Sequence, residues 1–582
     1  MTKTAQDNHQ PLWRLALVFV VIAGLCGVIA WKVADLQVLN NAAAQREGDA
    51  RTVRNDTIVA TRGNIVDRNG EPLAISTPVQ TLWLNPKEVL EHPEQGSMLE
   101  EAMSGIGIDP ALLNQRIAEN ASREFLYVKR RMPPADAQAV LDMGIKGVYA
   151  LEEYQRFYPM GEAAVHLVGL TNADDTGQEG MELAYEDWLR GTNGSKLVLK
   201  DRLGRIIREV QVNNEAQPGN DLTLSIDSRI QYIAYKALKE AVALRQASAG
   251  TATVLDAQTG EVLAMVNQPS YNPNNRASLT DGDLPNRAMV SLLEPGSTVK
   301  TFTITAALES GLFDTETVID TSPGTFRVDR TMTVRDPVNY GPSTLARIIA
   351  KSSQVGASKI GLTLGEGPML EMLQRVGFGQ SMGTGFPGEE SGVLPNRSRW
   401  AKSEIATMAY GYGFQVTPVQ LASAYMIYAS GGLRKPVSLL KLQGPVSGER
   451  VISADIVAKV NDMLRGVVST EMGGTGVRAN IPSYQVAGKS GTAWYYNAGS
   501  GYDTRNYNSY FAGFVPASAP RVVIVISIHQ PKGDEYGGGA VAAPVFAQIA
   551  AGAMRILNVA PDAVEPVPVE IGMVSAAAGS AP

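Results

Sequence analysis

Residues 294–300 read Glu-Pro-Gly-Ser-Thr-Val-Lys and are followed by an apolar helical pattern. The Pro-Gly pair predicts a turn, so Ser297 is expected at the start of the helix, where free backbone N–H groups and the helix dipole favour developing negative charge. Lys300 comes three residues later and therefore lies on the same face of that helix. A lysine packed into such a site can lose its proton and act as a general base toward the serine. The stretch thus indicates a nucleophilic serine that needs no histidine, although a serine at a helix start followed by a surface lysine is also a common structural arrangement.

Two further polar elements follow in the sequence. Lys351-Ser352-Ser353-Gln354 interrupts a helical pattern that fills much of residues 344–376, and Gly488-Lys489-Ser490-Gly491-Thr492 lies in a strand-like context. The second element resembles the end of a phosphate-binding loop, G-x-x-x-x-G-K-[ST]. Its first glycine, however, would fall at Ser483, and an aromatic run follows where a helix is needed. A phosphate-binding loop is therefore rejected.

The order S-x-x-K, S-x-amide, K-S-G-T resembles the signature of penicillin-binding proteins and serine β-lactamases. This resemblance implies a transpeptidase domain of the α/β (α+β) class, with helices packed against an antiparallel sheet. It also implies two groups of site residues, namely the catalytic residues Ser297, Lys300 and Ser352 and the substrate-binding residues Gln354, Lys489, Ser490, Gly491 and Thr492. In this scheme Lys300 takes the serine proton and Ser352 relays a proton toward the leaving amine. The backbone N–H groups of Ser297 and Thr492 form the oxyanion hole.

Five other stretches are similar to class B penicillin-binding proteins, and in particular to their cell-division (FtsI-like) subtype. Three of them resemble the non-catalytic motifs of that class, and two more resemble other family segments. They are residues 62–70, 156–162, 177–182, 200–205 and 412–422. The resemblance implies an elongated, β-rich pedestal in front of the transpeptidase domain and one N-terminal transmembrane helix.

The N-terminal run Leu15–Trp31 is uncharged and mostly apolar, and Arg14 and Lys32 flank it. Its length is at the short end of what a helix needs to cross a bilayer, and the flanking cations can reach the two interfaces. A cleaved signal peptide is the alternative, with the alanines at 42–44 near its cleavage site, but such apolar cores are usually shorter. We therefore predict an uncleaved, single-pass anchor in the bacterial inner (cytoplasmic) membrane, with the catalytic domain in the periplasm.

Turn signals and shifts in composition divide the chain into five predicted segments. In order, they are a cytoplasmic tail (1–14), a transmembrane anchor (15–33), a non-catalytic pedestal domain (34–219), the transpeptidase domain (220–560) and a flexible tail (561–582). The last segment is rich in Ala, Pro and Val and poor in large apolar residues, which favours disorder over packing.

Local patterns predict several elements of these domains. Residues 97–145 are expected to be helical, as are residues 228–243. Residues 251–266 predict a β-hairpin, and the apolar run 521–528 predicts a buried strand. Together they indicate a sandwich in which helices cover an antiparallel sheet.

The composition excludes several classes of function. The net charge is −7, and no basic run is interleaved with aromatic residues, which argues against nucleic-acid binding. The single cysteine, Cys26, rules out an intrachain disulfide, and the four histidines are scattered. No metal site, Ser-His-Asp triad or cofactor is therefore expected.

The resemblance implies septal cross-linking of peptidoglycan by D,D-transpeptidation. Ser297 would attack the penultimate D-Ala carbonyl of a stem peptide, while Lys489, Ser490 and Thr492 hold the terminal carboxylate. β-Lactam antibiotics would acylate the same serine, and the implied partners are the membrane, a SEDS-family glycan polymerase and other division proteins. Three alternatives stay open: a D,D-carboxypeptidase or β-lactamase-like hydrolase, a membrane β-lactam sensor, and a non-catalytic scaffold of the division complex.

The chain departs from the family pattern at two positions. Gln354 stands where the family usually has asparagine, and Trp494 stands where it often has a basic residue. Glutamine keeps the amide, so the chemistry is expected to persist, whereas substrate positioning and the range of β-lactams bound are expected to change.

Overall fold

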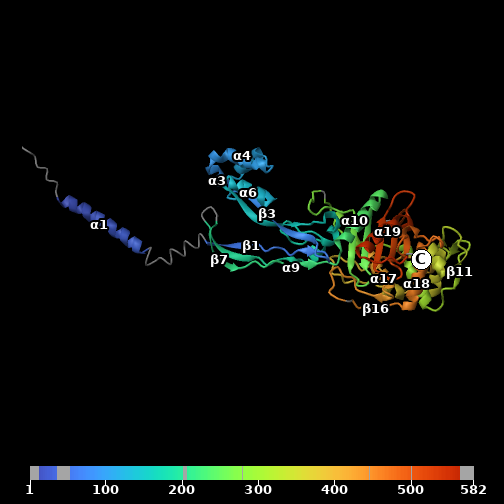
Figure 1. Ribbon diagram of the computed structural model, residues 1–582. Helices are drawn as coiled ribbons and strands as arrows, with labels where there is room; N and C mark the ends of the chain where they lie inside the picture. The colour runs from blue at the N-terminus through green and yellow to red at the C-terminus, as the bar shows by residue number, and fades with distance from the viewer. Residues whose placement is uncertain are drawn as a thin grey trace, which may run out of the picture. The chain divides into compact units, whose positions relative to one another are not determined.

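The computed structural model describes residues 12–35, 53–200, 206–277, 279–444, 446–497, 499 and 501–563, which fall into two compact units (Figure 1). Unit 1 takes its described residues from Met1–Thr61, Pro78–Glu153 and Gly191–Pro218, and unit 2 from Arg62–Thr77, Tyr154–Arg190 and Gly219–Pro582. The predicted domain limits stay predictions. Most of the predicted cytoplasmic and flexible tails, and residues 201–205 of the family segment 200–205, lie outside the described residues.

The N-terminal apolar run forms helix α1 (Leu12–Ala34). The most apolar 18 residues within its segment Trp13–Ala34 have a mean hydropathy of 2.4, and none of these residues is buried in the protein. At about 1.5 Å per residue, such a helix can cross the roughly 30 Å hydrocarbon core of a bilayer. A second helix of the described chain, α19 (Gly538–Ile556), is also long and apolar enough, but 56% of its most apolar 18-residue stretch is buried. Helix α1 is therefore the candidate membrane anchor.

Unit 2 is built on an antiparallel sheet with the strand order β10-β9-β19-β18-β17. The strands are β10 (Val262–Gln268), β9 (Ala249–Asp256), β19 (Val522–His529), β18 (Gly501–Val515) and β17 (Ala487–Asn497). Every residue of β9 and β19 is buried, as the central position of both strands requires. The predicted hairpin and the predicted buried strand are confirmed by β9, β10 and β19.

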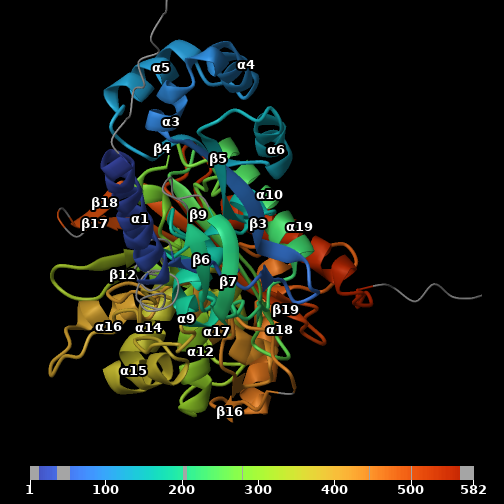
Figure 2. The same ribbon diagram turned by 90° about the vertical axis from the view of Figure 1, so that its left-hand side faces the viewer.

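Helices cover both faces of this sheet, and the alternation along β19 sends its side chains to two cores (Figure 2). Ile524 packs with α10 (Ser228–Leu244) and α19, whereas Val523 and Val525 belong to the core that contains α12 (Lys300–Glu309) and α17 (Pro418–Ala429). The predicted helix over residues 228–243 is confirmed by α10, and the sandwich is confirmed with it.

The remaining elements of unit 2 surround this sandwich. Its other helices of four or more residues are α7 (Val165–Val168), α8 (Gly180–Ala184), α9 (Glu186–Leu189), α11 (Arg287–Val290), η5 (Gly296–Val299), α13 (Leu345–Lys351), α14 (Gln354–Leu364), α15 (Glu366–Arg375), α16 (Lys402–Met408) and α18 (Ala454–Val468). Its short strands are β2 (Ile65–Val66), β8 (Leu222–Thr223), β11 (Val318–Asp320), β12 (Thr325–Arg327), β13 (Thr333–Arg335), β14 (Pro342–Thr344), β15 (Leu433–Arg434) and β16 (Glu449–Arg450).

Unit 1 contains a three-stranded antiparallel sheet and a small helical layer. The sheet has the order β1-β6-β7, with β1 (Val53–Ile58), β6 (Gly194–Lys200) and β7 (Ile206–Asn214). The helices are α3 (Pro86–Glu91), α4 (Gly96–Gly105), α5 (Pro110–Glu119) and α6 (Pro134–Asp142).

One prediction for unit 1 is wrong in part. Residues 97–145 were expected to be helical, but β4 (Leu126–Met132) interrupts them and pairs with the end of β3 (Pro72–Leu84). The Leu-Tyr-Val start of β4 is rich in the aromatic and branched residues that suit a pleated surface. Pairing with a distant strand therefore outweighs the helical pattern on either side.

The three non-catalytic stretches meet in unit 2 at one buried cluster of charges, called here the arginine–glutamate cluster and made of Arg62, Arg156, Glu182 and Glu186. The two oxygens of Glu182 accept from Arg62 Nε and from Arg156 Nε, each at 2.7 Å. Arg62 Nη1 donates to Glu186 at 2.6 Å. The side chains of both arginines and of Glu182 are at most 2% exposed, so each buried charge faces an opposite one.

Candidate active site

Ser297 lies in the short 3₁₀ helix η5, directly before α12, as the sequence predicted. The preceding Gly296 has φ +54°, and a Cβ there would lie 2.9 Å from the carbonyl oxygen of Thr492, so the turn needs glycine. Every residue of α12 from Lys300 to Ala307 is buried. The serine is thus held at the end of a helix that the core fixes in place.

Lys300 brings its amine to two serines. Its Nζ lies 3.1 Å from Ser297 Oγ, 3.2 Å from Ser352 Oγ and 2.5 Å from the Ser352 carbonyl oxygen. Burial lowers the pKa of Lys300 to about 7, and the negative charge of Asp336 opposes this shift. A substantial fraction of Lys300 is therefore neutral at physiological pH and can accept a proton.

Ser352 lies between α13 and α14 in the left-handed conformation, with φ 59°. This reversal ends the first helix and turns the serine toward the two lysines, because Lys489 Nζ also donates to Ser352 Oγ, at 3.0 Å. The polar interruption that the sequence predicted in residues 344–376 is thus a break between two helices at a left-handed residue. The hydroxyl of Ser352 is shared by both amines.

Lys489 lies on β17 and is fully buried. Its Nζ donates to the carbonyl oxygen of Ser490 at 2.8 Å. Burial, together with the charge of Lys300, holds the pKa of Lys489 well below its usual range. We call Lys300 and Lys489, with the hydroxyls of Ser297 and Ser352 between them, the lysine–serine cluster.

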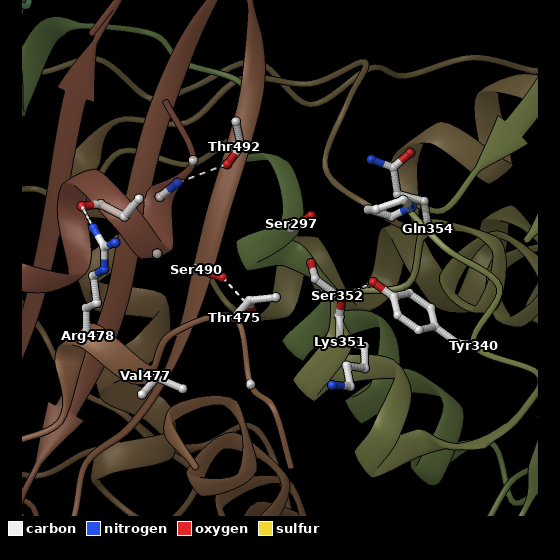
Figure 3. Close-up of a pocket in the computed structure, with 16 residues that line it drawn as sticks. Ser297, Tyr340, Lys351, Ser352, Gln354, Thr475, Val477, Arg478, Ser490 and Thr492 are labelled. Carbon is white, nitrogen blue, oxygen red and sulfur yellow. Dashed lines mark hydrogen bonds between the residues drawn. The ribbon is translucent and has the colours of Figure 1, made fainter. Parts of the chain in front are cut away.

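The rest of the KSGT stretch forms one wall of a cavity of about 500 Å³ (Figure 3). Ser490 Oγ lies 2.7 Å from Thr475 Oγ1, and Thr492 Oγ1 accepts the N–H of Gly538 at 3.0 Å. A Cβ at Gly491 would lie 2.8 Å from the methyl group of Thr298, so the strand can approach η5 only with glycine here. Serine and threonine hydroxyls on this wall can donate to a carboxylate.

Gln354 lies on the opposite side of Ser297 from β17 in Figure 3. It is the first residue of α14, and its backbone N–H donates to Asp336 at 2.6 Å. Its side-chain amide makes no hydrogen bond with the described part of the chain, and it borders both the cavity at Ser297 and a second one. The amide is therefore available to a bound molecule.

The second cavity, of about 970 Å³, borders Gln354 and Thr492, and its lining includes Trp494 and several tyrosines. Trp494 is 42% exposed; its backbone N–H donates to Tyr412 Oη at 3.1 Å, and its ring meets those of Tyr412 and Tyr502 edge-on. Trp494 thus contributes an aromatic side chain to the lining of this cavity.

Of the sequence-predicted residues, the structure joins five in one chain of side-chain contacts, in the order Ser297, Lys300, Ser352, Lys489 and Ser490. Thr475 and Asp336 were missed. Thr475 had one available signal, because it lies in the glycine-rich run 473–476. Asp336 had none, because its partners on α14 are distant in sequence.

Comparisons with known proteins agree with this architecture. The family described as "Penicillin binding protein transpeptidase domain" matches residues 250–551, and "Penicillin-binding Protein dimerisation domain" matches residues 57–224. The probable peptidoglycan D,D-transpeptidase PbpC of Pseudomonas aeruginosa is 39% identical over 94% of this chain and 95% of its own length. The peptidoglycan D,D-transpeptidase FtsI of Escherichia coli is 38% identical over 96% and 94%, respectively.

Solved structures give the same result. Penicillin-binding protein 3 of Mycobacterium tuberculosis in complex with aztreonam has a TM-score of 0.67 and 29% identity, and the alignment covers 87% of this chain and 98% of that one. The transpeptidase domain of Burkholderia pseudomallei penicillin-binding protein 3 has a TM-score of 0.53 and 40% identity, covering 58% and 97%. Fold and matches define a transpeptidase of the penicillin-binding class. The chain belongs to the penicillin-binding protein transpeptidase family, which confirms the predicted resemblance and fold class.

Proposed function

We propose that the chain is a peptidoglycan D,D-transpeptidase that works through an acyl-enzyme on Ser297. One observation carries the proposal: a buried lysine with a lowered pKa lies 3.1 Å from the hydroxyl of a serine that opens into a cavity. A neutral amine at hydrogen-bonding distance is what a serine nucleophile needs for activation when no histidine is near it.

The reaction begins with the attack of Ser297 Oγ on the penultimate D-Ala carbonyl of a stem peptide. Lys300 takes the hydroxyl proton as the new C–O bond forms, and the backbone N–H groups of Ser297 and Thr492 stabilise the oxyanion. Ser352, between the two lysines, passes a proton to the departing amine of D-Ala. An amine of a neighbouring stem then attacks the ester, and Ser297 recovers its proton.

The wall of β17 holds the terminal carboxylate of the substrate. Ser490 and Thr492 offer hydroxyl donors, Gly491 allows close approach of the backbone, and the amine of Lys489, which bonds to Ser490, offers a further N–H donor. On the other side, the amide of Gln354 binds the substrate's peptide group. β-Lactams acylate the same serine, because their strained amide carbonyl occupies the place of the D-Ala-D-Ala bond.

Replacement of Ser297 tests the assignment. The full-length Ser297→Ala protein should lose all labelling by a fluorescent penicillin while keeping its unfolding temperature. Ser310→Ala, at the far end of α12, is the matched control and should label like the wild type, because the Ser310 hydroxyl bonds to the backbone of Ala307 and Leu312 and lies outside the proposed site. Undiminished labelling of folded Ser297→Ala protein would reject Ser297 as the nucleophile.

Mass spectrometry after penicillin treatment separates the transpeptidase from its alternatives. A persistent adduct on the peptide that contains Ser297 supports a transpeptidase or a sensor. Rapid release of hydrolysed drug supports a hydrolase, and no adduct supports a scaffold. D-Ala exchange on a donor stem peptide, measured with labelled D-amino acids, then distinguishes the enzyme from a sensor.

The division role and the topology belong to the same proposal. Helix α1 stays attached as the membrane anchor and places the body of the chain in the periplasm, where a SEDS-family polymerase and other division proteins would supply and organise the glycan strands. Intact-mass analysis of the membrane-extracted protein checks the anchor. A chain that begins near Gln45 would show that the segment had been cleaved.

A further inference from the structure

A carboxylate outside the predicted motifs holds the start of α14. Asp336 follows β13 and is half-buried. Its Oδ1 accepts the backbone N–H groups of Gln354 at 2.6 Å and Val355 at 3.2 Å, and its Oδ2 accepts the hydroxyl of Ser353 at 2.6 Å. Three successive residues of the chain are therefore tied to one side chain.

These three residues come directly after Ser352, whose left-handed backbone is unfavourable for a residue other than glycine. Such a conformation persists only where its surroundings fix it. On one side, the backbone N–H of Ser352 bonds to Ile349 in α13. On the other side, Asp336 fixes the next residue, Ser353. The position of the Ser352 hydroxyl between the two lysines thus depends on Asp336.

The strand that precedes Asp336 packs against the helix that Asp336 holds. Val334 of β13 is buried in a small cluster with Val355 and Ala357 of α14 and with Tyr410. Pro337, the residue after Asp336, borders both cavities. A displacement of Asp336 would therefore move the cavity wall as well as Ser352 and Gln354.

Asp336 also acts on Lys300 by its charge. Among the described residues, the ionisable groups whose charges act within the lysine–serine cluster are Lys300, Lys489 and Asp336. The oxygens of Asp336 are occupied by the donors of α14, so its effect on Lys300 is exerted through space. It is the negative charge that opposes loss of the Lys300 proton.

We propose that Asp336 is a positioning residue for acylation, which holds Ser352 and Gln354 in place and whose negative charge favours the protonated form of Lys300. The inference rests on the proposed acylation of Ser297. It separates two effects: the hydrogen bonds set the maximal acylation rate, and the charge sets the pH at which Lys300 becomes an effective base.

The test compares Asp336→Asn and Asp336→Glu with wild-type, full-length protein in detergent, through the rate of acylation by a fluorescent penicillin between pH 5 and 9. Asp336→Asn keeps the shape, loses the charge and weakens the hydrogen bonds, so its maximal rate should fall about tenfold or more. Its acid limb should move to lower pH, because Lys300 loses its favourable neighbour. Asp336→Glu keeps the charge but displaces the carboxylate, so its rate should fall while its acid limb stays near that of the wild type.

Asp314→Asn is the matched control. Asp314 also accepts a hydroxyl and a backbone N–H, at 2.7 and 3.0 Å, but it lies in the exposed loop after α12. Its rate should stay within about twofold of the wild type, as expected for a surface substitution.

Each outcome decides one part of the inference. Wild-type rate and pH profile in both Asp336 variants overturn it, and a loss of rate with an unmoved acid limb in Asp336→Asn overturns the role of the charge. If Asp336→Asn unfolds, Asp336→Glu and Ser353→Ala, which removes one of the three donors, still test the positioning role by their rates. Failure of the wild type to acylate would instead refute the proposed function.

Discussion

Unit 2 buries two clusters of ionisable side chains that differ in the partners of their basic groups. In the arginine–glutamate cluster, each buried arginine meets a carboxylate at 2.6 to 2.7 Å. In the lysine–serine cluster, the two amines meet hydroxyls and carbonyl oxygens, and the pKa values of both lysines are lowered. Paired charges stay charged and join distant segments, whereas unpaired amines give up protons, which is the property that a general base needs.

The largest expected effect comes from removing a lysine from the second cluster. Lys300→Met should lower the acylation rate about a hundredfold to ten-thousandfold, because the general base is lost. Its unfolding temperature should equal or exceed that of the wild type, since a buried amine without a carboxylate partner is replaced by an apolar chain of similar length. Penicillin kinetics and thermal unfolding check this together. A normal rate, or a marked loss of stability, would contradict the contrast between the clusters.

The reverse result is expected in the first cluster. Glu182→Gln leaves Arg62 and Arg156 without their shared carboxylate, so it should cost about 3–5 kcal/mol of stability. The acylation rate per folded molecule should stay unchanged, because Glu182 has no part in the proposed reaction. Denaturant unfolding and active-site titration measure the two quantities. Asp455→Asn, which breaks an exposed pair with Lys459 on α18, is the control and should have little effect on either.

The sequence predicted contacts between neighbours in the chain, but sequence patterns alone did not predict the contacts between distant residues in the two clusters. Ser297 and Lys300 are three residues apart on one helix, so their proximity follows from helical geometry. The approach of Lys489 to Ser352, across 137 residues, was expected only through a resemblance to a known family. Arg62 and Glu182 are separated by 120 residues, and nothing in either stretch indicates that they form a pair.

The same limit explains the strand and the carboxylate that were missed. Leu126–Met132 becomes a strand because β3 is there to pair with it, and Asp336 becomes important because α14 begins beside it. Periodicity and turn residues report on neighbours in the sequence, whereas these features depend on partners that the fold supplies.

The lowered pKa of Lys300 predicts that both acylation and stability depend on pH. The acylation rate should rise with pH through about 7, since only neutral Lys300 can accept the serine proton.

The stability of the protein should also depend on pH. The ordinary lysine pKa of 10.5 applies to the unfolded chain and a value of about 7 to the folded one, so the unfolded state binds more protons between these values. The contribution of Lys300 to stability therefore increases as pH rises from about 7 to 10.5.

Lys300→Met provides the control for this titration, because it removes the group. Its stability should change less with pH over that window than the stability of the wild type. Denaturant unfolding at pH 7 and pH 9 gives the change in the free energy of unfolding for each protein. If that change is equal in the variant and the wild type, Lys300 is not held neutral by burial.

The smallest expected effects come from neutral groups at the edges of the two clusters. The Ser76 hydroxyl accepts from Arg156 Nη1 at 3.1 Å and donates to the Arg62 carbonyl oxygen at 3.3 Å, so both of its roles are occupied within the protein. The Gln354 amide has no such partner among the described residues and borders the cavity at Ser297. Ser76→Ala should therefore lower stability slightly and leave the acylation rate unchanged. Gln354→Ala should leave stability unchanged and lower the acylation rate.

We expect Gln354→Ala to acylate about tenfold more slowly, since loss of one buried hydrogen bond costs about 1–3 kcal/mol. Gln354→Asn keeps the amide on a side chain one methylene shorter, so its effect should be smaller, of either sign, and should depend on the β-lactam. Stopped-flow acylation of the three forms by several β-lactams measures both effects. If Gln354→Ala matches the wild type with every compound, the amide makes no contact that matters for acylation. Gln354 would then resemble Ser76, which has no expected role in binding the substrate.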